Sequence, residues 1–410
     1  MSESIITRRG SGGYAKVTFD VPCTKLNKVS NVSMLSVERD HLASTTLGDY
    51  ALFGGGYSYS SVDTVEVYNK NLTRSTITSL SHIRCELDAT TVGNYALFGG
   101  GWDDIYRSNV VDAYDSNLVR STALSLNIEA SLLSATTVGN YAIFAGGFSS
   151  SEHSSDITTA YNINLTRTSP VSLWEGREKL ASTSVGNYAL FGGGYNSYNV
   201  RGSNCVDIYD SNLTHSLRSL VFTYGKWNLS ATTVGNHAIF GCGRFAYGAS
   251  PYCGNMESFD NNLTRSEVSS GHVYEEYAAT TLGDYALFAG GVYATSGQLP
   301  KRENYTGVDV YDKNTVLHYN FAPDIGLGRE RLSASTIGKY ALFAGGRIGE
   351  SNPKNYVDAF TFETKKIQIY PMSKYKFNDM GSETTSQTLQ EIELTTPITG
   401  YIKVKNTTVN

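Results

Sequence analysis

One motif recurs seven times along this chain of 410 residues, and its spacing constrains the fold more than any other feature. The first copy, GDYALFGGG, starts at Gly48. The later copies start at Gly93, Gly139, Gly186, Gly235, Gly283 and Gly338, at spacings of 45, 46, 47, 49, 48 and 55 residues. Such periods are typical of the four-stranded blades of β-propellers and are too long for ankyrin or tetratricopeptide units. The chain is therefore predicted to be an all-β protein, a seven-bladed β-propeller.

Each repeat contains four segments with strand character. A run of small and β-branched residues, such as Ala43–Leu47, precedes the motif glycine and suits an inner strand A. Gly-Asn or Gly-Asp then predicts a two-residue turn, and Tyr-Ala-Leu-Phe forms strand B, which the glycines end. A variable stretch leads to strand C, as in Val65–Tyr68, and strand D runs through Leu-Thr-Arg, as at Leu72–Arg74. Each repeat is thus one four-stranded blade.

The repeat resembles the kelch repeat. A diglycine closes the second strand, and a hydrophobic–acidic–hydrophobic–Tyr strand follows, over roughly residues 36 to 372. The tryptophan that kelch repeats usually carry after this tyrosine is absent, and the leucine of Leu-Thr-Arg takes its place. The short blades, rich in Ser, Thr and Asn, are more similar to the kelch-like propellers of bacteria and their phages than to eukaryotic substrate adaptors.

The segment before the first repeat predicts how the ring closes. Leu35 and Arg39 match Leu80 and Arg84 of the next repeat, so an additional D-like strand precedes the first blade. Such a strand commonly completes the blade formed by the other terminus and removes exposed sheet edges. We predict that residues 28–35 join the last blade, with Lys366–Tyr370 as the competing segment.

Two short β flanks are expected outside the propeller. The predicted organisation is an N-terminal flank over residues 1–25, the propeller over 26–372 and a C-terminal flank over 373–410. Similar strings at Gly13–Val17 and Gly400–Val404 indicate short strands. They form either a small flap packed on the propeller or a docking strand for a larger assembly.

Charge and hydropathy exclude some classes of partner. The chain has 33 Lys and Arg against 38 Asp and Glu, and its net charge of −5 gives no reason to expect a nucleic acid as partner. No apolar run approaches the roughly 18 residues of a membrane helix, so no membrane insertion is expected. The first residues lack the apolar core of a secretory signal. We expect synthesis in the cytoplasm without a signal peptide, which is compatible with incorporation into a virion or another particle.

The sequence carries no familiar catalytic motif. There is no GxSxG, GxxxxGK[ST], HExxH or paired CxxC pattern, and the seven histidines lack metal-ligand spacing. We expect no metal and no cofactor, and no catalytic residue is assigned. Cys242 and Cys253 flank one predicted hairpin, where two free thiols are favoured over a disulfide, although pairing stays open. The Asn-Leu-Thr strings that fit a glycosylation sequon belong to the repeated turn between strands C and D.

The strand order sorts the connections onto two faces. Strands alternate in direction, so the A–B and C–D turns share one face, the turn face, and the B–C and D–A connections share the other, the loop face. The turns are near-copies of one another, whereas the B–C stretches vary from 8 residues (Tyr57–Thr64) to 16 (Val292–Gly307). They are rich in Tyr, Trp and Arg, which are enriched in binding hot spots. The loop face is therefore the predicted binding surface, although loops also vary for lack of constraint.

The predicted ligand-binding residues all lie in these connections. They are Tyr57, Tyr59, Trp102, Asp104, Tyr106, Arg107, Trp174, Tyr195, Tyr198, Arg201, Trp227, Arg244, Tyr247, Tyr252, Tyr293, Arg302, Tyr305 and Arg347. The D–A connections add Arg177, Tyr224, His272, Tyr274, Arg329 and Arg331.

Two functions are compatible with these features. The first is a non-catalytic recognition propeller that binds a protein or a cell-surface glycan, as in a phage tail or another bacterial particle, and that docks to a larger assembly through its flanks. The alternative is a carbohydrate-active enzyme, an oxidase or a glycosidase, with its site at the propeller axis. The sequence favours the non-catalytic function and names neither the ligand nor the oligomeric state.

Overall fold

The structure is a computed structural model that describes eleven stretches of the chain. These are residues 14–18, 25–151, 153–244, 252–253, 255–271, 275–294, 302–349, 351–362, 365–369, 390–394 and 401–405. The chain divides into two compact units, Lys28–Thr361 and the two flanks, Met1–Asn27 with Phe362–Asn410. In the described residues no helix is long and apolar enough to cross a membrane.

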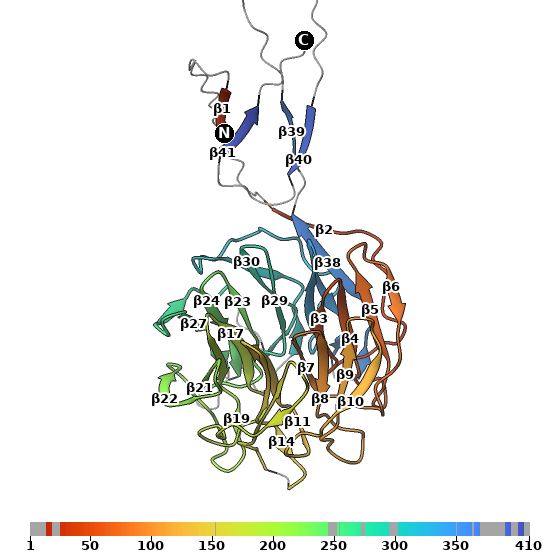
Figure 1. Ribbon diagram of the computed structural model, residues 1–410, viewed down its shortest axis with the longest axis vertical. Coiled ribbons are helices and arrows are strands. Elements are labelled where there is room, and N and C mark those ends of the chain that lie inside the picture. The colour runs from red at the N-terminus through yellow and green to blue at the C-terminus, as the bar shows by residue number, and fades with distance from the viewer. Residues whose placement is uncertain are drawn as a thin grey trace, which may run out of the picture. The chain divides into compact units, whose positions relative to one another are not determined.

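The larger unit is a seven-bladed β-propeller (Figure 1). Its sheets, read outward from the axis, are: blade 1, β3 (Ala43–Leu47), β4 (Tyr50–Gly54), β5 (Val65–Asn69) and β6 (Arg74–Thr76); blade 2, β7 (Asp88–Val92), β8 (Tyr95–Gly99), β9 (Val111–Asp115) and β10 (Arg120–Ala123); blade 3, β12 (Ser134–Val138), β13 (Tyr141–Ala145), β15 (Thr158–Asn162) and β16 (Arg167–Thr168); blade 4, β17 (Ala181–Val185), β18 (Tyr188–Gly192), β21 (Cys205–Asp210) and β22 (His215–Val221); blade 5, β23 (Ala231–Val234), β24 (His237–Phe240), β27 (Met256–Asp260) and β28 (Arg265–Val268); blade 6, β29 (Ala278–Leu282), β30 (Tyr285–Ala289) and β33 (Val308–Asp312); and blade 7, β34 (Ser333–Ile337), β35 (Tyr340–Ala344), β38 (Val357–Phe362) and β2 (Leu26–Lys28). The predicted fold class is confirmed.

The N-terminal segment closes the ring, as predicted. In Figure 1 the red β2 lies beside the blue β38 at the outer edge of blade 7. The Val29 N–H donates to the Ala359 carbonyl at 2.8 Å, and the Leu35 N–H donates to Asn355 at 2.9 Å. The regular strand ends at Lys28, earlier than the predicted range of 28–35. The competing C-terminal segment, β39 (Lys365–Ile369), pairs instead with β40 (Gln390–Leu394).

The flanks contain the two strands expected from their similar strings. β1 (Tyr14–Thr18) pairs antiparallel with β41 (Tyr401–Lys405), so strands from opposite ends of the chain form one ladder. Whether the flanks dock to an assembly stays a prediction.

Blade 6 departs from the four-stranded pattern. Its sheet has three strands, and outside β33 there is a single bridge between Tyr311 and Leu317 in the described residues. After Tyr319 the chain turns away at Asn320, which has a φ of 55°. Pro323, which has no N–H to give to a ladder, follows shortly. The predicted fourth strand is therefore reduced to this bridge.

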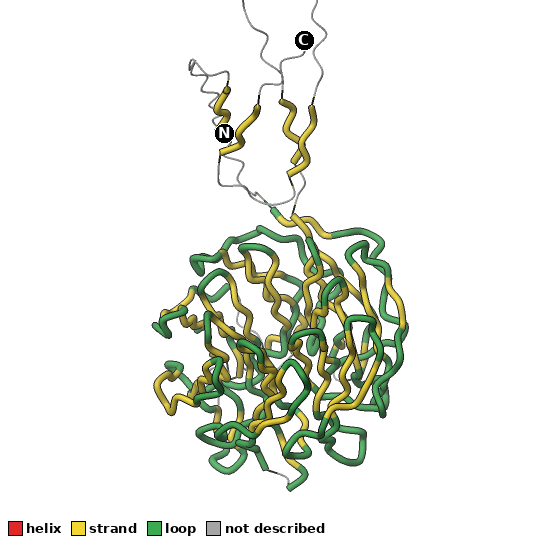
Figure 2. The backbone as a smooth tube through the Cα atoms, in the orientation of Figure 1, coloured by secondary structure: helices red, strands yellow, loops and turns green. Residues whose placement is uncertain are grey.

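Tight turns and strand alternation follow from the repeated residues (Figure 2). In blade 1, Leu47 lies opposite Tyr50, which leaves a two-residue turn that begins at Gly48. The motif glycine of all seven A–B turns has a φ between 54° and 57°, a region that glycine enters without the cost a Cβ imposes. Strand B is buried on both pleat faces because a neighbouring blade covers each side.

Hydroxyl groups of strand A join neighbouring blades near the axis. The Thr91 hydroxyl donates to the Thr46 carbonyl at 2.7 Å, linking blade 2 to blade 1. The Thr46 hydroxyl donates in turn to the Thr336 carbonyl at 2.6 Å, across the junction between blades 1 and 7. Small hydroxyl-bearing residues at these positions thus hold the innermost strands together.

The hydrophobic core lies between blades. A Cβ added to Gly54 would come within 2.7 Å of the Phe98 ring, so the glycine at the end of one strand B receives the phenylalanine of the next blade. That ring packs edge-on against Tyr114, at 5.8 Å between centroids. The Tyr114 hydroxyl donates to the Thr78 carbonyl of the preceding blade at 2.8 Å. The glycine and phenylalanine of the motif and the tyrosine of strand C therefore stabilise the contact between blades 1 and 2, and Gly99 receives Phe144 of blade 3 in the same way.

Gly55, the middle glycine of the run that ends the motif, is expected to be intolerant of substitution. At Gly55, where φ is 65°, a Cβ would lie 2.5 Å from the Arg84 carbonyl oxygen and 2.8 Å from Leu87. Gly55→Ala should therefore lower the free energy of unfolding by about 3 kcal/mol or more, from overpacking and backbone strain together. Gly48→Ala is the matched control, because Gly48 has a φ of 55° but no atom within 4 Å of the added Cβ. It should cost about 1–2 kcal/mol. Equal losses in urea denaturation would contradict the packing argument.

A buried ion pair recurs in the blades. A basic side chain from the D–A connection meets an acidic side chain at the second position of strand C. The pairs are Arg39–Glu66, Arg84–Asp112, Arg177–Asp207, Lys226–Glu257 and Arg329–Asp358. The residue that opens strand D supplies a second cation, as Arg120 does for Asp112 at 3.2 Å. The Leu-Thr-Arg string is therefore explained by this pairing.

The buried pairs correct part of the predicted binding surface. Arg177 and Arg329 are fully buried and ion-paired, so they do not belong to the loop-face surface. Blade 3 has Ala130 and Thr159 at the two positions of the pair, and both are buried. Blade 3 therefore lacks both the acidic and the basic member of the ion pair, as expected because one buried charge without its partner would destabilise the fold.

Candidate functional site on the loop face

Backbone pairing shows that the B–C and D–A connections meet on one face. In every blade the residue after the diglycine position pairs with the residue after the basic position of the D–A connection. The pairs are Asp40–Tyr57, Cys85–Trp102, Ser131–Phe148, Glu178–Tyr195, Trp227–Arg244, Glu275–Val292 and Glu330–Arg347. We call these fourteen residues the second ring.

The opposite face repeats one construction. In blade 2 the Asp115 carboxylate accepts the N–H groups of Asn117 and Val119, each at 2.9 Å, and Leu118 has a φ of 62°. The same turn occurs at Asn69, Asn162, Asp210, Asp260 and Asp312. Side chains that bond their own backbone favour such turns. The turn face is thus uniform, whereas the loop face differs from blade to blade.

A closed collar of seven residues surrounds the axis inside the second ring. Its members are His41, Glu86, Leu132, Lys179, Asn228, Glu276 and Arg331, and all have a φ between 50° and 59°. Each collar N–H donates to the carbonyl of the equivalent residue in the preceding blade, at 2.8–3.2 Å. The Glu86 N–H donates to His41, and the circle closes where the His41 N–H donates to Arg331. The collar fixes seven side chains of six residue types at the mouth of the axis.

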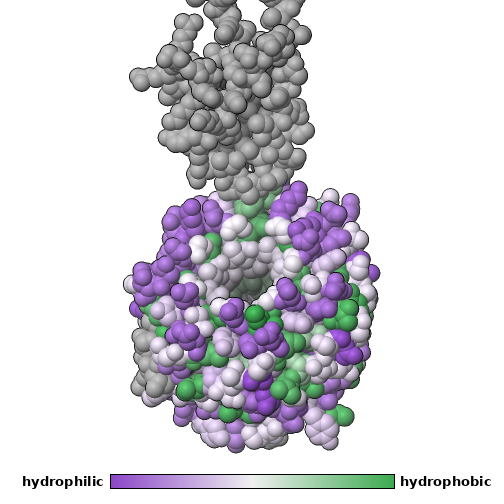
Figure 3. Space-filling model, viewed as in Figure 1, coloured by the Kyte–Doolittle hydropathy of each residue, from purple (hydrophilic) through white to green (hydrophobic). Residues whose placement is uncertain are grey.

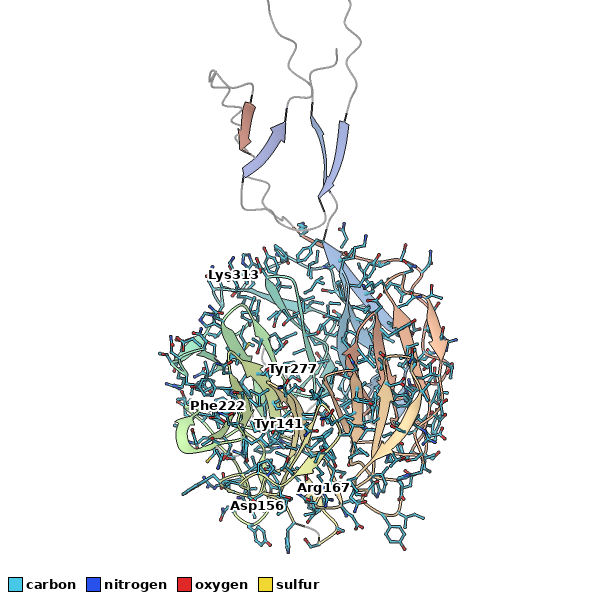
Figure 4. The ribbon with its side chains drawn as sticks, viewed as in Figure 1. Tyr141, Asp156, Arg167, Phe222, Tyr277 and Lys313 are labelled. Carbon is cyan, nitrogen blue, oxygen red and sulfur yellow. The ribbon has the colours of Figure 1, made fainter. Side chains whose placement is uncertain are left out.

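The collar opens into an axial cavity of about 460 Å³. Strand A residues and the residues just before them line it, among them Asp88, Ser134, Ser230 and Tyr277. Figure 3 shows the hollow at the centre of the ring, and in Figure 4 Tyr277 lies toward the centre whereas Lys313 lies at the periphery. Small Ser and Ala side chains leave this space open.

Asp88 places a carboxyl group in the axial cavity. Other blades have Ala or Ser at this position of strand A. Its carboxylate accepts the N–H of Ala89 at 2.8 Å and that of Ala135, in the next blade, at 2.7 Å. Burial raises the pKa of Asp88 to about 7, although both hydrogen bonds oppose the rise. Near neutral pH this group is able to donate or to accept a proton.

Asp88 also predicts a dependence of stability on pH. Because its pKa is higher in the folded chain than in the unfolded chain, its contribution to stability is complete below about pH 4 and is lost as pH rises to about 7. D88N removes this titration. The free energy of unfolding of D88N, relative to wild type, should therefore rise between pH 4 and pH 7 and level off above. Chemical denaturation at several pH values measures the difference, and a constant difference would contradict the assignment.

The loops of blades 1 to 4 are linked to one another. The Ser61 N–H donates to Asp104 of the next blade at 2.9 Å. The Arg107 guanidinium carbon lies 4.3 Å from the centre of the Phe148 ring, and the Ser154 N–H donates to the Ser197 hydroxyl at 2.9 Å. Each link crosses from one blade to the next, so these loops are pre-organised rather than independent.

The predicted site residues fall into four groups. The second ring contains Tyr57, Trp102, Tyr195, Trp227, Arg244 and Arg347. Exposed positions outside it are those of Tyr59, Tyr106, Trp174, Tyr198, Arg201, Tyr224 and Tyr293. Asp104 and Arg107 form the inter-loop links, and Tyr305 is half-buried near the end of its loop. Tyr247, His272 and Tyr274 lie outside the described residues, as do the side chains of Tyr252 and Arg302.

Several residues of the face were missed in the sequence. They are the collar residues except Arg331, Asp88 in the cavity, and the second-ring residues Asp40, Cys85, Ser131, Phe148, Glu178, Glu275, Val292 and Glu330. Alignment of the D–A connections would have shown the collar as one variable position directly before a leucine that recurs in six of the seven repeats. The hairpin register places Cys253 opposite Gly243 rather than Cys242.

Comparison with known proteins shows the fold. No protein-family model and no curated protein matches the chain. Among solved structures, the chain is similar to the structure of YjhT, with a TM-score of 0.54 and 10% sequence identity over 80% of this chain and 97% of that chain. The described part of the chain contains no group of three or more His, Cys, Asp or Glu side chains arranged to hold a metal ion.

Proposed function

We propose that the chain is a kelch-like recognition propeller whose loop face binds a cell-surface glycan or a protein receptor without catalysing a reaction. The observation that carries the proposal is the contrast between the two faces. One face repeats a single turn, whereas the other presents different aromatic side chains on linked loops. Tyr59, Tyr106 and Tyr198 are 75%, 71% and 67% exposed there. Rigid aromatic residues bind partners at a low cost in conformational entropy.

The ends of the propeller are compatible with this function. β2 begins and β38 ends on the turn face, because strand D starts where strand C finishes. The chain therefore enters and leaves the propeller away from the loop face. We include in the proposal that the flanks dock to a larger assembly, such as a phage tail or another bacterial particle.

A second candidate is a carbohydrate-active enzyme with its site at the axis. It is favoured by Asp88, a carboxyl with a pKa of about 7 inside the axial cavity. A general acid or base needs a pKa near the working pH.

One experiment separates the two functions. The labelled full-length chain is applied to a glycan array and to bacterial envelope fractions, and release of reducing sugar from the same samples is measured. Binding without release supports recognition. Release that D88N abolishes supports the enzyme.

A further inference from the structure

Tyr195, Trp227 and Arg244 form a cluster, called the platform below, where blades 4 and 5 meet in the second ring, and its two aromatic rings are tilted by 57° to each other. The rings of Tyr195 and Trp227 lie 5.2 Å apart between centroids, and the Arg244 guanidinium carbon lies 5.9 Å from the centre of the indole ring. Two backbone hydrogen bonds, of 3.2 and 2.8 Å, hold Trp227 and Arg244 opposite each other. A Cβ on Gly202 would come within 2.9 Å of the indole ring, so the neighbouring loop supports that ring. The two aromatic side chains of the platform are therefore held in place and half-buried, whereas Arg244 is exposed.

Glu178 is the backbone partner of Tyr195 in the second ring and has an unsatisfied carboxylate oxygen. Glu178 and Tyr195 exchange two backbone hydrogen bonds, of 3.0 and 2.7 Å, and directly opposed residues of an antiparallel pair project to the same side. Glu178 is 8% exposed, and its Oε2 is buried with no hydrogen-bond partner. Buried polar atoms of native proteins normally have a partner. The unpartnered oxygen is thus able to accept a hydrogen bond from a ligand.

The electrostatic surroundings of Glu178 agree with this assignment. Burial raises the pKa of its carboxyl, Glu86 raises it further, and Lys179 and Arg107 lower it. A second carboxylate placed here would be repelled by Glu178 and Glu86. A ligand with neutral hydroxyl groups donates to Glu178 and accepts from the exposed Arg244 without such repulsion.

We propose that Tyr195, Trp227, Arg244 and Glu178 form a binding site for a neutral pyranose unit of a glycan. The apolar C–H face of a pyranose ring packs on the indole ring, with the tilted Tyr195 ring at its edge, while its hydroxyls reach Glu178 and Arg244. This inference rests on the proposed recognition function and narrows its ligand from a glycan or a protein to a neutral sugar.

Saturation-transfer NMR with the full-length chain tests the site. The probes are the methyl pyranosides of glucose, galactose and mannose, with methyl glucuronoside as the charged comparison. At least one neutral pyranoside should receive saturation, most strongly at its ring C–H protons, and W227A should abolish the signal. E178Q keeps the shape of the side chain and should weaken binding about tenfold with unchanged thermal unfolding. Y319A is the control, because Tyr319 is 70% exposed on the outer side of blade 6.

The outcomes separate this site from the broader function. If W227A fails to fold, E178Q decides the test alone. Pyranoside affinity that E178Q leaves unchanged overturns the site, and so does tighter binding of the glucuronoside than of every neutral sugar. If no pyranoside binds but the chain retains a protein receptor from envelope fractions, the sugar site is wrong and the recognition function stands. If the chain retains neither glycan nor protein, both fail.

Discussion

Replacing Arg84 by alanine is expected to lower the free energy of unfolding by about 3–5 kcal/mol, because it leaves Asp112 buried without its closest cation. Both side chains are 0% exposed, and they lie 2.5 Å apart. Arg84 also donates to the carbonyls of Gly100 and Val110, each at 2.8 Å. These acceptors would lose their partner as well. Guanidinium denaturation of the full-length chain measures the loss.

The chain itself offers a matched control for this prediction. The double variant R84A/D112T copies blade 3, which has Ala130 and Thr159 at the same two positions. Thr159 accepts the N–H of Asn127 at 3.1 Å, so a threonine at position 112 is able to replace one acceptor of the lost aspartate. The double variant should recover about half of the loss or more, because no unpaired charge remains buried. A double variant less stable than R84A would contradict this account.

Removal of the exposed tyrosines is expected to abolish recognition without unfolding the propeller. Tyr59, Tyr106 and Tyr198 project from the loops of blades 1, 2 and 4. Aromatic hot spots contribute about 2 kcal/mol or more each, so a single change to alanine should weaken binding roughly 30-fold. The triple variant should retain no measurable binding to the glycan or receptor that the wild type binds. Interferometry measures affinity, and thermal unfolding reports the fold.

The control for this prediction is a tyrosine that belongs neither to these three loop tips nor to the second ring. Y319A removes a side chain of similar exposure, 70%, from the outer side of blade 6 and should leave binding unchanged. Unchanged affinity in the triple variant would show that the loop tips are not the binding surface. Equal losses in Y319A and the triple variant would show that the effect is not specific to that face.

The repeat predicted blade number, strand order and the division into two faces because these depend on local signals. Gly48 and its equivalents specify the A–B turn by backbone conformation, and the Asn and Asp residues of the C–D turn bond their own backbone. The strand that closes the ring was also predictable, since Leu35 and Arg39 repeat the pattern of Leu80 and Arg84. The turn signals involve residues near one another in the chain, whereas the closing strand pairs with β38 at the other end of the propeller and was predictable because it repeats a local pattern.

The role of the arginines was harder to predict. Arg177 and Arg329 have the residue type of a binding surface, yet their partners Asp207 and Asp358 lie about 30 residues away, on strand C of the same blade. The sequence alone does not show that an arginine is buried, because the acidic residue that pairs with it lies far away along the chain.

By itself, the sequence determined the seven-bladed ring and the contrast between a uniform face and a variable one. The number of repeats gives the number of blades, and the similar turns and dissimilar loops within the repeats give the two faces. Only the tertiary structure decided which variable residues come together. The collar brings Glu86, Lys179 and Glu276 from different blades to one mouth, and the platform joins Tyr195 of blade 4 to Trp227 of blade 5. Such contacts connect residues that are 30 to 100 positions apart or more, and closure of the ring, rather than any local preference, places them side by side.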